Sequence, residues 1–118
     1  MGFVPGSIIK RRMTGVFGIL FHHMGIYVNN DMVIHFTGEK KRGKAQNILI
    51  CKDTLQTFTE SCEIKLHTAP KNFYHAKAVC EEANRLLRDK NNRYNHQYSF
   101  VFNNCEDFCI ACYEVQYY

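Results

Sequence analysis

Three features of the sequence predict an α+β fold. Short segments rich in branched and aromatic residues occur in the first half of the chain, at residues 16–21, 24–28 and 32–36, and such segments are typical of strands. The spacing of apolar residues then becomes helical over residues 70–90, and a second helix start follows at Asn104. We therefore expect an antiparallel sheet of four or five strands packed against two or three helices.

The length and composition are those of one globular domain spanning residues 1–118. Apolar residues make up 46% of the chain, enough for a core without disulfides or metal ions. The longest apolar run, residues 16–21, is far shorter than the ~20 residues of a membrane-spanning helix, and residues 1–14 lack the pattern of a signal peptide. We expect a cytoplasmic protein, or one peripheral to membranes, with reduced cysteines and no cofactor.

Further strands and turns follow from the same signals. Residues 7–10, after Pro5-Gly6, predict a first short strand, residues 47–51 and 62–66 predict later ones, and residues 98–102 predict an extended segment. Asn29, Asn30 and Asp31 predict a turn, because these side chains tolerate left-handed backbone. Residues 39–44 are mostly charged and are predicted to form a loop.

The two helices have recognisable ends. The first is predicted by apolar residues at three-four spacing, namely Phe73, Ala76, Val79, Cys80, Ala83, Leu86 and Leu87. Pro70 suits its first turn, and Asn91-Asn92 suits its end. The second helix is predicted to begin at Cys105, because Asn104 is a good N-cap and the acidic residues 106 and 107 complement the helix dipole.

Cys105 is the candidate nucleophile of a Cys–His–His site. A thiol attacks as the thiolate, and a helix N-terminus and a neighbouring imidazole both lower the pKa of a cysteine. His23 is the candidate base, and His35 would bind its far ring nitrogen, as the carboxylate does in a serine triad. Backbone amides at the helix start are candidates for stabilising an oxyanion. The alternative is a buried cysteine with core histidines.

The hairpin between the two histidines tests this hypothesis. His23 and His35 have the same parity, and side chains alternate between the faces of a strand. The two rings therefore share a face only if the connecting loop has an odd number of residues. A loop of Asn29, Asn30 and Asp31 meets that condition, whereas a two-residue loop would separate the histidines.

Cys109 and Cys112 lie on the same helix face as Cys105, at i, i+4 and i+7. We interpret all three as small residues of a buried face, and zinc or an iron–sulfur cluster is the alternative. No metal is therefore predicted.

Two basic runs stand out in a chain of net charge +4, namely residues 10–12 and the group Lys40, Lys41, Arg42 and Lys44. Solvated charge is the simpler interpretation. The alternative is that these side chains contact RNA phosphates or anionic phospholipid headgroups.

Four segments, in order, resemble the lecithin:retinol acyltransferase-like family, whose fold is papain-like, NlpC-type and circularly permuted. They are Pro5-Gly-Ser-Ile-Ile-Lys10, His23-Met-Gly-Ile-Tyr-Val28, Val33-Ile-His35 and the Asn-Cys box Asn104-Cys-Glu-Asp-Phe108. Residues 51–58 also resemble the middle region of the family. The resemblance implies that Cys105 is the nucleophile, His23 the base and His35 the third member. It also implies cleavage or transfer of phospholipid acyl chains through an acyl-cysteine.

The sequence departs from the family pattern at three points. Asp107 stands where the family has histidine, Met24 stands where it has tryptophan, and no segment resembles the C-terminal membrane anchor of cellular members. In these respects the chain resembles the picornaviral 2A proteins of the H-box/NC type. That resemblance implies a viral protein in the host cytoplasm that acts in replication through a host protein factor or RNA.

Two functions remain open. We favour a replication accessory protein that binds a host factor or RNA and retains the Cys–His–His site. The alternative is an enzyme, a thiol phospholipase A or acyltransferase that forms an acyl-cysteine at Cys105.

Overall fold

The computed structural model describes residues 2–12, 22–41, 44–95 and 104–117. These residues form a five-stranded antiparallel sheet and three helices, so the predicted α+β class is confirmed. The strands are β1 (Ile8–Arg12), β2 (His22–Val28), β3 (Met32–Lys41), β4 (Lys44–Thr54) and β5 (Lys65–Thr68). The helices are α1 (Leu55–Thr59), α2 (Phe73–Arg88) and α3 (Cys105–Tyr113).

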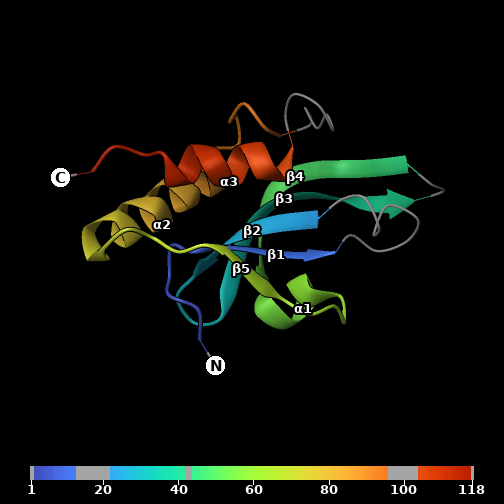
Figure 1. Cartoon of the computed structure of the whole chain (residues 1–118). Coiled ribbons are helices and arrows are strands. Elements are labelled where there is room, and N and C mark those ends of the chain that lie inside the picture. The colour runs from blue at the N-terminus through green and yellow to red at the C-terminus, as the bar shows by residue number, and fades with distance from the viewer. Residues whose placement is uncertain (1, 13–21, 42–43, 96–103, 118) are drawn as a thin grey trace.

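The sheet separates two layers of helices. Its strand order is β4-β3-β2-β1-β5, with α2 and α3 on one face and α1 on the other (Figure 1). The larger core cluster lies under α2 and α3 and includes Ile26, Ile34 and Phe108. The smaller cluster lies under α1 and consists of Ile9, Tyr27, Val33 and Phe58. Even-numbered residues of β2 and β3 therefore face α2 and α3, and odd-numbered residues face α1.

The β2–β3 hairpin has the predicted three-residue loop. Val28 pairs with Met32, which leaves residues 29–31 between the strands. Asn30 and Asp31 have φ angles of 65° and 54°, a left-handed conformation that asparagine and aspartate adopt more readily than most residues. The condition for placing the two histidines on one face is met.

Helix α2 is shorter than predicted. It begins at Phe73 and not in the turn containing Pro70, because the Asn72 side chain accepts a hydrogen bond from the His75 backbone N–H and caps the helix there. It ends at Arg88. Ala76, Val79, Ala83 and Leu86 are buried as predicted, whereas Phe73 is 75% exposed at the first position of the helix. The prediction that Phe73 belongs to the apolar stripe was wrong.

The predicted loop at residues 39–44 was also wrong. Strand β3 continues to Lys41 and β4 begins at Lys44, with Lys40 opposite Ala45 and Lys41 opposite Lys44. Ladder hydrogen bonds are made by the backbone, so a run of charged side chains does not by itself end a hairpin.

The remaining strand predictions differ mainly at their boundaries. The strands predicted at residues 7–10, 47–51 and 62–66 are observed as β1, β4 and β5. The strand predicted at residues 16–21 and the extended segment at residues 98–102 lie outside the described residues. Helix α1 was not predicted. None of the described helices combines the length and apolar character needed to cross a membrane.

Candidate active site

Three side chains from neighbouring strands form a hydrogen-bonded row. Nε2 of His23 on β2 lies 2.8 Å from Nδ1 of His35 on β3. Nε2 of His35 lies 2.8 Å from Oδ2 of Asp53 on β4. Both histidines are 4% exposed. The predicted contact between the two imidazoles is therefore present, and Asp53 extends it to a third group that the sequence did not reveal.

Strand register accounts for this row. His35 pairs directly with Cys51, and Val33 pairs with Asp53. Residues 33, 35, 51 and 53 consequently point to the same face, the one that carries α1. Since His23 shares this face through the odd-numbered loop, the polar row runs across β2, β3 and β4.

The row fixes the tautomers of both imidazoles when they are assigned from their hydrogen bonds. The Asp53 carboxylate can only accept, so His35 donates its Nε2–H to Asp53 and keeps a lone pair on Nδ1. That lone pair accepts the Nε2–H of His23, which places the basic lone pair of His23 on Nδ1. Burial lowers the pKa of His35 below its ordinary value, and the Asp53 carboxylate opposes this effect only in part. His35 is therefore a neutral relay near pH 7.

Phe58 and Gly25 hold the two rings in place. The Phe58 ring stacks on His23 with centroids 5.4 Å apart and meets His35 edge-on at 5.2 Å. A Cβ at Gly25 would lie 2.5 Å from Cγ1 of Val33 and 3.0 Å from Cε1 of Phe58. Only glycine at this position lets α1 approach the sheet closely enough for Phe58 to cover the histidines.

Arg11 on β1 links α1 to the sheet through contacts with Phe58 and Glu60. Its Nε donates to the Phe58 carbonyl at 2.5 Å, and its guanidinium carbon lies 5.5 Å from the Phe58 ring centroid. Nη2 of Arg11 lies 3.4 Å from the Glu60 carboxylate. This buried cation also disfavours protonation of His35.

Cys105 is the first residue of α3, as predicted, and Asn104 is its N-cap. The Asn104 side chain accepts hydrogen bonds from the amides of Glu106 and Asp107, and Asp107 accepts one from the Asn104 amide. This capping box explains Asp107, the residue that replaces the histidine of the family motif. The amides of residues 106 and 107 donate to Asn104 and are therefore already used; for the other backbone amides around Cys105, the oxyanion role stays a prediction.

The Cys105 thiol lies against the beginning of β2. Sγ is 3.9 Å from the His22 carbonyl oxygen, and Cys105 is 4% exposed within the larger core cluster. The next residue along the strand is His23, whose ring stacks on Phe58 on the α1 side of the sheet. The thiol and the histidine row thus approach the first two residues of β2 from the two faces of the sheet.

Cys51 is a thiol beside the row. Its Sγ lies 3.5 Å from Nε2 of His35 and 3.7 Å from Oδ2 of Asp53. Burial, helped by the Asp53 charge, raises the pKa of Cys51 to about 12. In the part of the chain that the structure describes, these three residues form the one group with the donor spacing of a metal site. A metal ion there would need the Cys51 thiolate and would displace the His35–Asp53 hydrogen bond, so the donor set fits the relay better.

The other predicted residues are accounted for as follows. Cys109 and Cys112 are fully buried in the larger core cluster, and burial raises the pKa of both thiols. Their prediction as core residues is confirmed. All six cysteines lie among the described residues, and no disulfide joins any two of them. Lys40, Lys41 and Lys44 lie on β3 and β4, but their side chains and Arg42 are outside the described structure, so their binding role stays a prediction.

Residues 5–117 match the family model described as lecithin retinol acyltransferase. The matched range contains both histidines, Asp53 and Cys105. No curated protein matches the sequence. The narrower resemblance to picornaviral 2A proteins stays a prediction.

Proposed function

Because the chain belongs to the lecithin retinol acyltransferase family, we propose that it is a thiol acyltransferase or phospholipase A with Cys105 as its nucleophile. The observation that carries the proposal is the hydrogen-bonded row His23–His35–Asp53, which begins on β2 next to His22, the residue whose carbonyl the Cys105 thiol contacts. A buried row of this kind has a cost in desolvation that an apolar core would avoid. The hydrogen bonds of the row place the basic lone pair of His23 on Nδ1, and activation of a thiol requires a basic nitrogen of this kind.

The reaction follows the division of roles that the row supports. The reaction requires the Cys105 thiol, on the α3 side, to reach Nδ1 of His23 around the end of β2. His23 then accepts the thiol proton, and the thiolate attacks the carbonyl carbon of a lipid ester. The tetrahedral intermediate collapses as the C–O bond to the alcohol breaks, and the alcohol leaves with the proton held by His23. Water or an amine then attacks the acyl-cysteine while His23 accepts its proton; the C–S bond breaks, and Cys105 leaves as the thiol with the proton returned by His23. Hydrolysis gives a phospholipase, and transfer to an amine gives an acyltransferase.

His35 and Asp53 act on this reaction through His23. The imidazolium formed on His23 keeps its hydrogen bond to Nδ1 of His35, and the Asp53 charge stabilises it through the shared row. The helix start at Cys105 adds a partial positive charge that favours the thiolate. The buried position of both imidazoles strengthens each of these interactions, because the surrounding dielectric is low.

Intact-protein mass spectrometry tests the proposal. The protein is incubated with a short-chain phosphatidylcholine, and an added acyl mass is expected on the wild type. Cys105→Ala should lose the adduct, while Cys80→Ala, which removes a half-buried thiol on α2, should retain it. An adduct that persists in Cys105→Ala, or no adduct and no released fatty acid from a folded wild type, would exclude Cys105 as the nucleophile for this ester.

A role as a binding protein is the second candidate, supported by a large apolar groove. The groove has a volume of about 760 Å³ and runs from Val4 along α2 past Phe73 and Asn84. Phe73, 75% exposed, and its neighbour Tyr74, 64% exposed, lie at the start of α2. Exposed aromatic side chains are frequent anchors of protein interfaces. A host protein factor is the expected partner if the picornaviral resemblance holds.

The two candidates differ in what they require of Cys105. Binding through the groove should survive Cys105→Ala and fail in a Phe73→Ser/Tyr74→Ser double variant. Binding of RNA through the hairpin should instead be weakened by replacing Lys40, Lys41, Arg42 and Lys44 with glutamine. Neither set of changes should abolish acyl-cysteine formation.

A further inference from the structure

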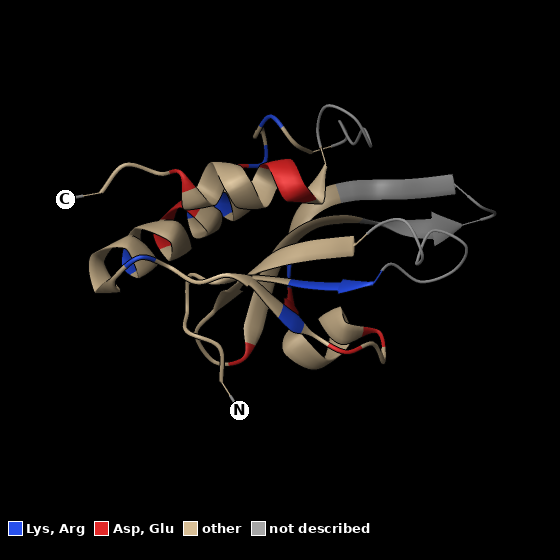
Figure 2. Ribbon diagram, viewed as in Figure 1, with Lys and Arg blue, Asp and Glu red and all other residues tan. Residues whose placement is uncertain are grey.

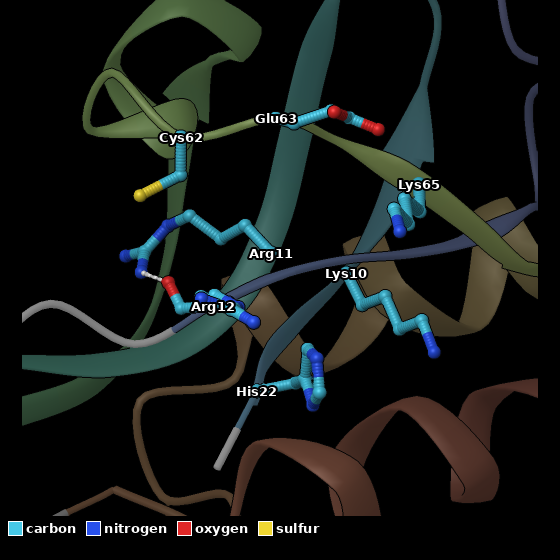
Figure 3. A pocket seen from close by; sticks show the side chains of 7 residues that line it. All are labelled: Lys10, Arg11, Arg12, His22, Cys62, Glu63 and Lys65. Carbon is cyan, nitrogen blue, oxygen red and sulfur yellow. Dashed lines mark hydrogen bonds between the residues drawn. The ribbon is translucent and has the colours of Figure 1, made fainter. Parts of the chain in front are cut away.

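A pocket of about 460 Å³ opens beside the candidate active site, at the ends of β1, β2 and β5. In Figure 2 the ribbon positions of Lys and Arg residues are marked along β1 and on β5. The pocket is lined mainly by the basic residues Lys10, Arg11, Arg12 and Lys65, with Glu63 as its acidic member and His22 at its edge (Figure 3). The same His22 offers its carbonyl to the Cys105 thiol.

Strand register sets two like charges against each other in this pocket, because Lys10 on β1 lies directly opposite Lys65 on β5. Arg12 lies directly opposite His22 on β2. Residues directly opposite each other in an antiparallel pair point to the same face, and like charges in such positions destabilise a sheet. Lys10 and Arg12 share that face because they are two residues apart on one strand.

Within the described residues, acidic side chains balance only part of this charge. Arg11 has the Glu60 carboxylate at 3.4 Å. Among the residues that the structure describes, no ion pair joins Lys10, Arg12 or Lys65 to an acidic side chain. Glu63 is exposed at the rim. The pocket therefore carries an excess of positive charge, which a bound anion would neutralise.

We propose that this pocket binds a phosphate group, and specifically the phosphate of the lipid ester whose acyl chain Cys105 attacks. A phosphate has several acceptor oxygens, which suits three cations that line one pocket from β1 and β5, and arginine binds it in a forked geometry. The identity of the phosphate as a lipid headgroup rests on the proposed function. The pocket as a phosphate site rests on register and charge alone.

The position of His22 links binding to chemistry. Its side chain lines the pocket, and its backbone carbonyl contacts the thiol. In a glycerophospholipid the phosphate and the ester carbonyl are joined by a few bonds of the glycerol unit. A phosphate held among Lys10, Arg12 and Lys65 therefore keeps the ester close to Cys105, which lowers the entropic cost of the reaction.

Binding is measured first, with the full chain carrying Cys105→Ala so that no turnover occurs. Glycerol phosphate is titrated by calorimetry into this protein and into the same protein with Lys10→Gln/Lys65→Gln. The double change should weaken binding roughly tenfold, because two charge-assisted contacts are lost. Lys71→Gln/Lys90→Gln removes the same net charge elsewhere and should leave the dissociation constant unchanged. Equal weakening in the two pairs, or none in the first, overturns the proposal.

Glu63→Gln gives the opposite change. Removing the rim carboxylate should tighten glycerol phosphate binding, and added salt should weaken binding in every variant. Inorganic phosphate and a short-chain phospholipid are compared in the same titration. Tighter binding of the phospholipid supports a headgroup as the source of the phosphate, and equal binding overturns that assignment in favour of free phosphate. Binding of a single-stranded RNA with no binding of glycerol phosphate would overturn the proposal altogether.

Activity and stability give two independent readouts. In a protein with intact Cys105, Lys10→Gln/Lys65→Gln should raise KM for a short-chain phospholipid roughly tenfold at unchanged kcat, and should not alter cleavage of neutral p-nitrophenyl butyrate. Failure of the wild type on both esters would remove the proposed function while leaving the binding result in force. Lys65→Gln should also raise the melting temperature without ligand, and phosphate should stabilise the wild type more than this variant.

Discussion

Replacing Asp53 with asparagine tests whether the histidine row works as a relay. Asp53→Asn keeps the size of the side chain but removes the charge that accepts the Nε2–H of His35 at 2.8 Å. An amide offers both an acceptor and a donor, so it no longer selects one tautomer of His35. When His35 presents Nδ1–H to His23 instead of a lone pair, the basic nitrogen of His23 is lost from its position.

The expected magnitude follows from the exposure of the two partners. A hydrogen bond between a charged and a neutral group contributes about 1.5–3 kcal/mol when it is buried. The Asp53 side chain is 37% exposed and that of His35 is 6% exposed, so solvent screening reduces this to about 1 kcal/mol. A bias of about 1 kcal/mol corresponds to roughly a fivefold change in the population of the productive tautomer. We expect kcat to fall by roughly five- to tenfold at unchanged KM.

The assay is release of fatty acid from a short-chain phospholipid, accompanied by urea unfolding and by ¹⁵N chemical shifts of the imidazoles. The shifts report the tautomers directly, whether or not the protein turns over substrate. Glu81→Gln, which removes an exposed carboxylate on α2, is the matched control. Unchanged kcat and unchanged imidazole shifts in a folded Asp53→Asn protein would refute the relay. An equal loss in the control would assign the effect to net charge.

Three other perturbations probe the support of the site. Gly25→Ala places a methyl group 2.5 Å from Val33 and 3.0 Å from Phe58. This crowding should lower the free energy of unfolding by about 1–3 kcal/mol and reduce kcat. An unaltered midpoint of urea unfolding would show that the neighbouring side chains move aside without cost. Asn104→Ala removes the N-cap of α3 and should lower the free energy of unfolding in urea by about 1 kcal/mol. A decrease smaller than a few tenths of a kcal/mol would mean that the capping box does not stabilise the helix. The pKa of His35 is lowered in the folded state, so as pH falls the unfolded chain binds this proton before the folded protein does. The contribution of His35 to the free energy of unfolding should therefore be fully present above the ordinary histidine pKa of about 6.5 and decrease as pH drops below it. His35→Asn should make the free energy of unfolding depend less steeply on pH below about 6.5, and an unchanged slope would exclude this contribution.

Local sequence signals predicted the parts of the site that depend on short-range geometry. The parity of His23 and His35 across a three-residue loop was sufficient to predict their contact, because a hairpin loop fixes register. Asn104 and Cys105 were recognised because N-cap chemistry is local. These features require no knowledge of how distant strands pair.

Asp53 was missed because its contact depends on the pairing of β3 with β4. Residues 39–44 were interpreted as a loop, so no register between these strands could be derived. The ladder instead runs from Met32 opposite Thr54 to Lys41 opposite Lys44. Helix α1 was missed for another reason. Its five residues are too few to show a helical repeat of apolar residues. The local feature that marks it is the N-cap Thr54, whose side chain accepts a hydrogen bond from the Thr57 amide.

Strand β2 lies between the Cys105 thiol on the α3 side of the sheet and the histidine row on the α1 side, and it contacts both. Its even-numbered residues anchor the sheet to α3, which brings Cys105 to the His22 carbonyl. Its odd-numbered residues carry His23 toward His35 and the cover of Phe58. Because a strand turns alternate residues to opposite faces, two adjacent residues are enough to place a thiol, a base and a phosphate pocket around one strand end. A one-residue shift in the register of β2 would exchange these faces, so the three-residue hairpin loop is as necessary to the proposed reaction as the side chains themselves.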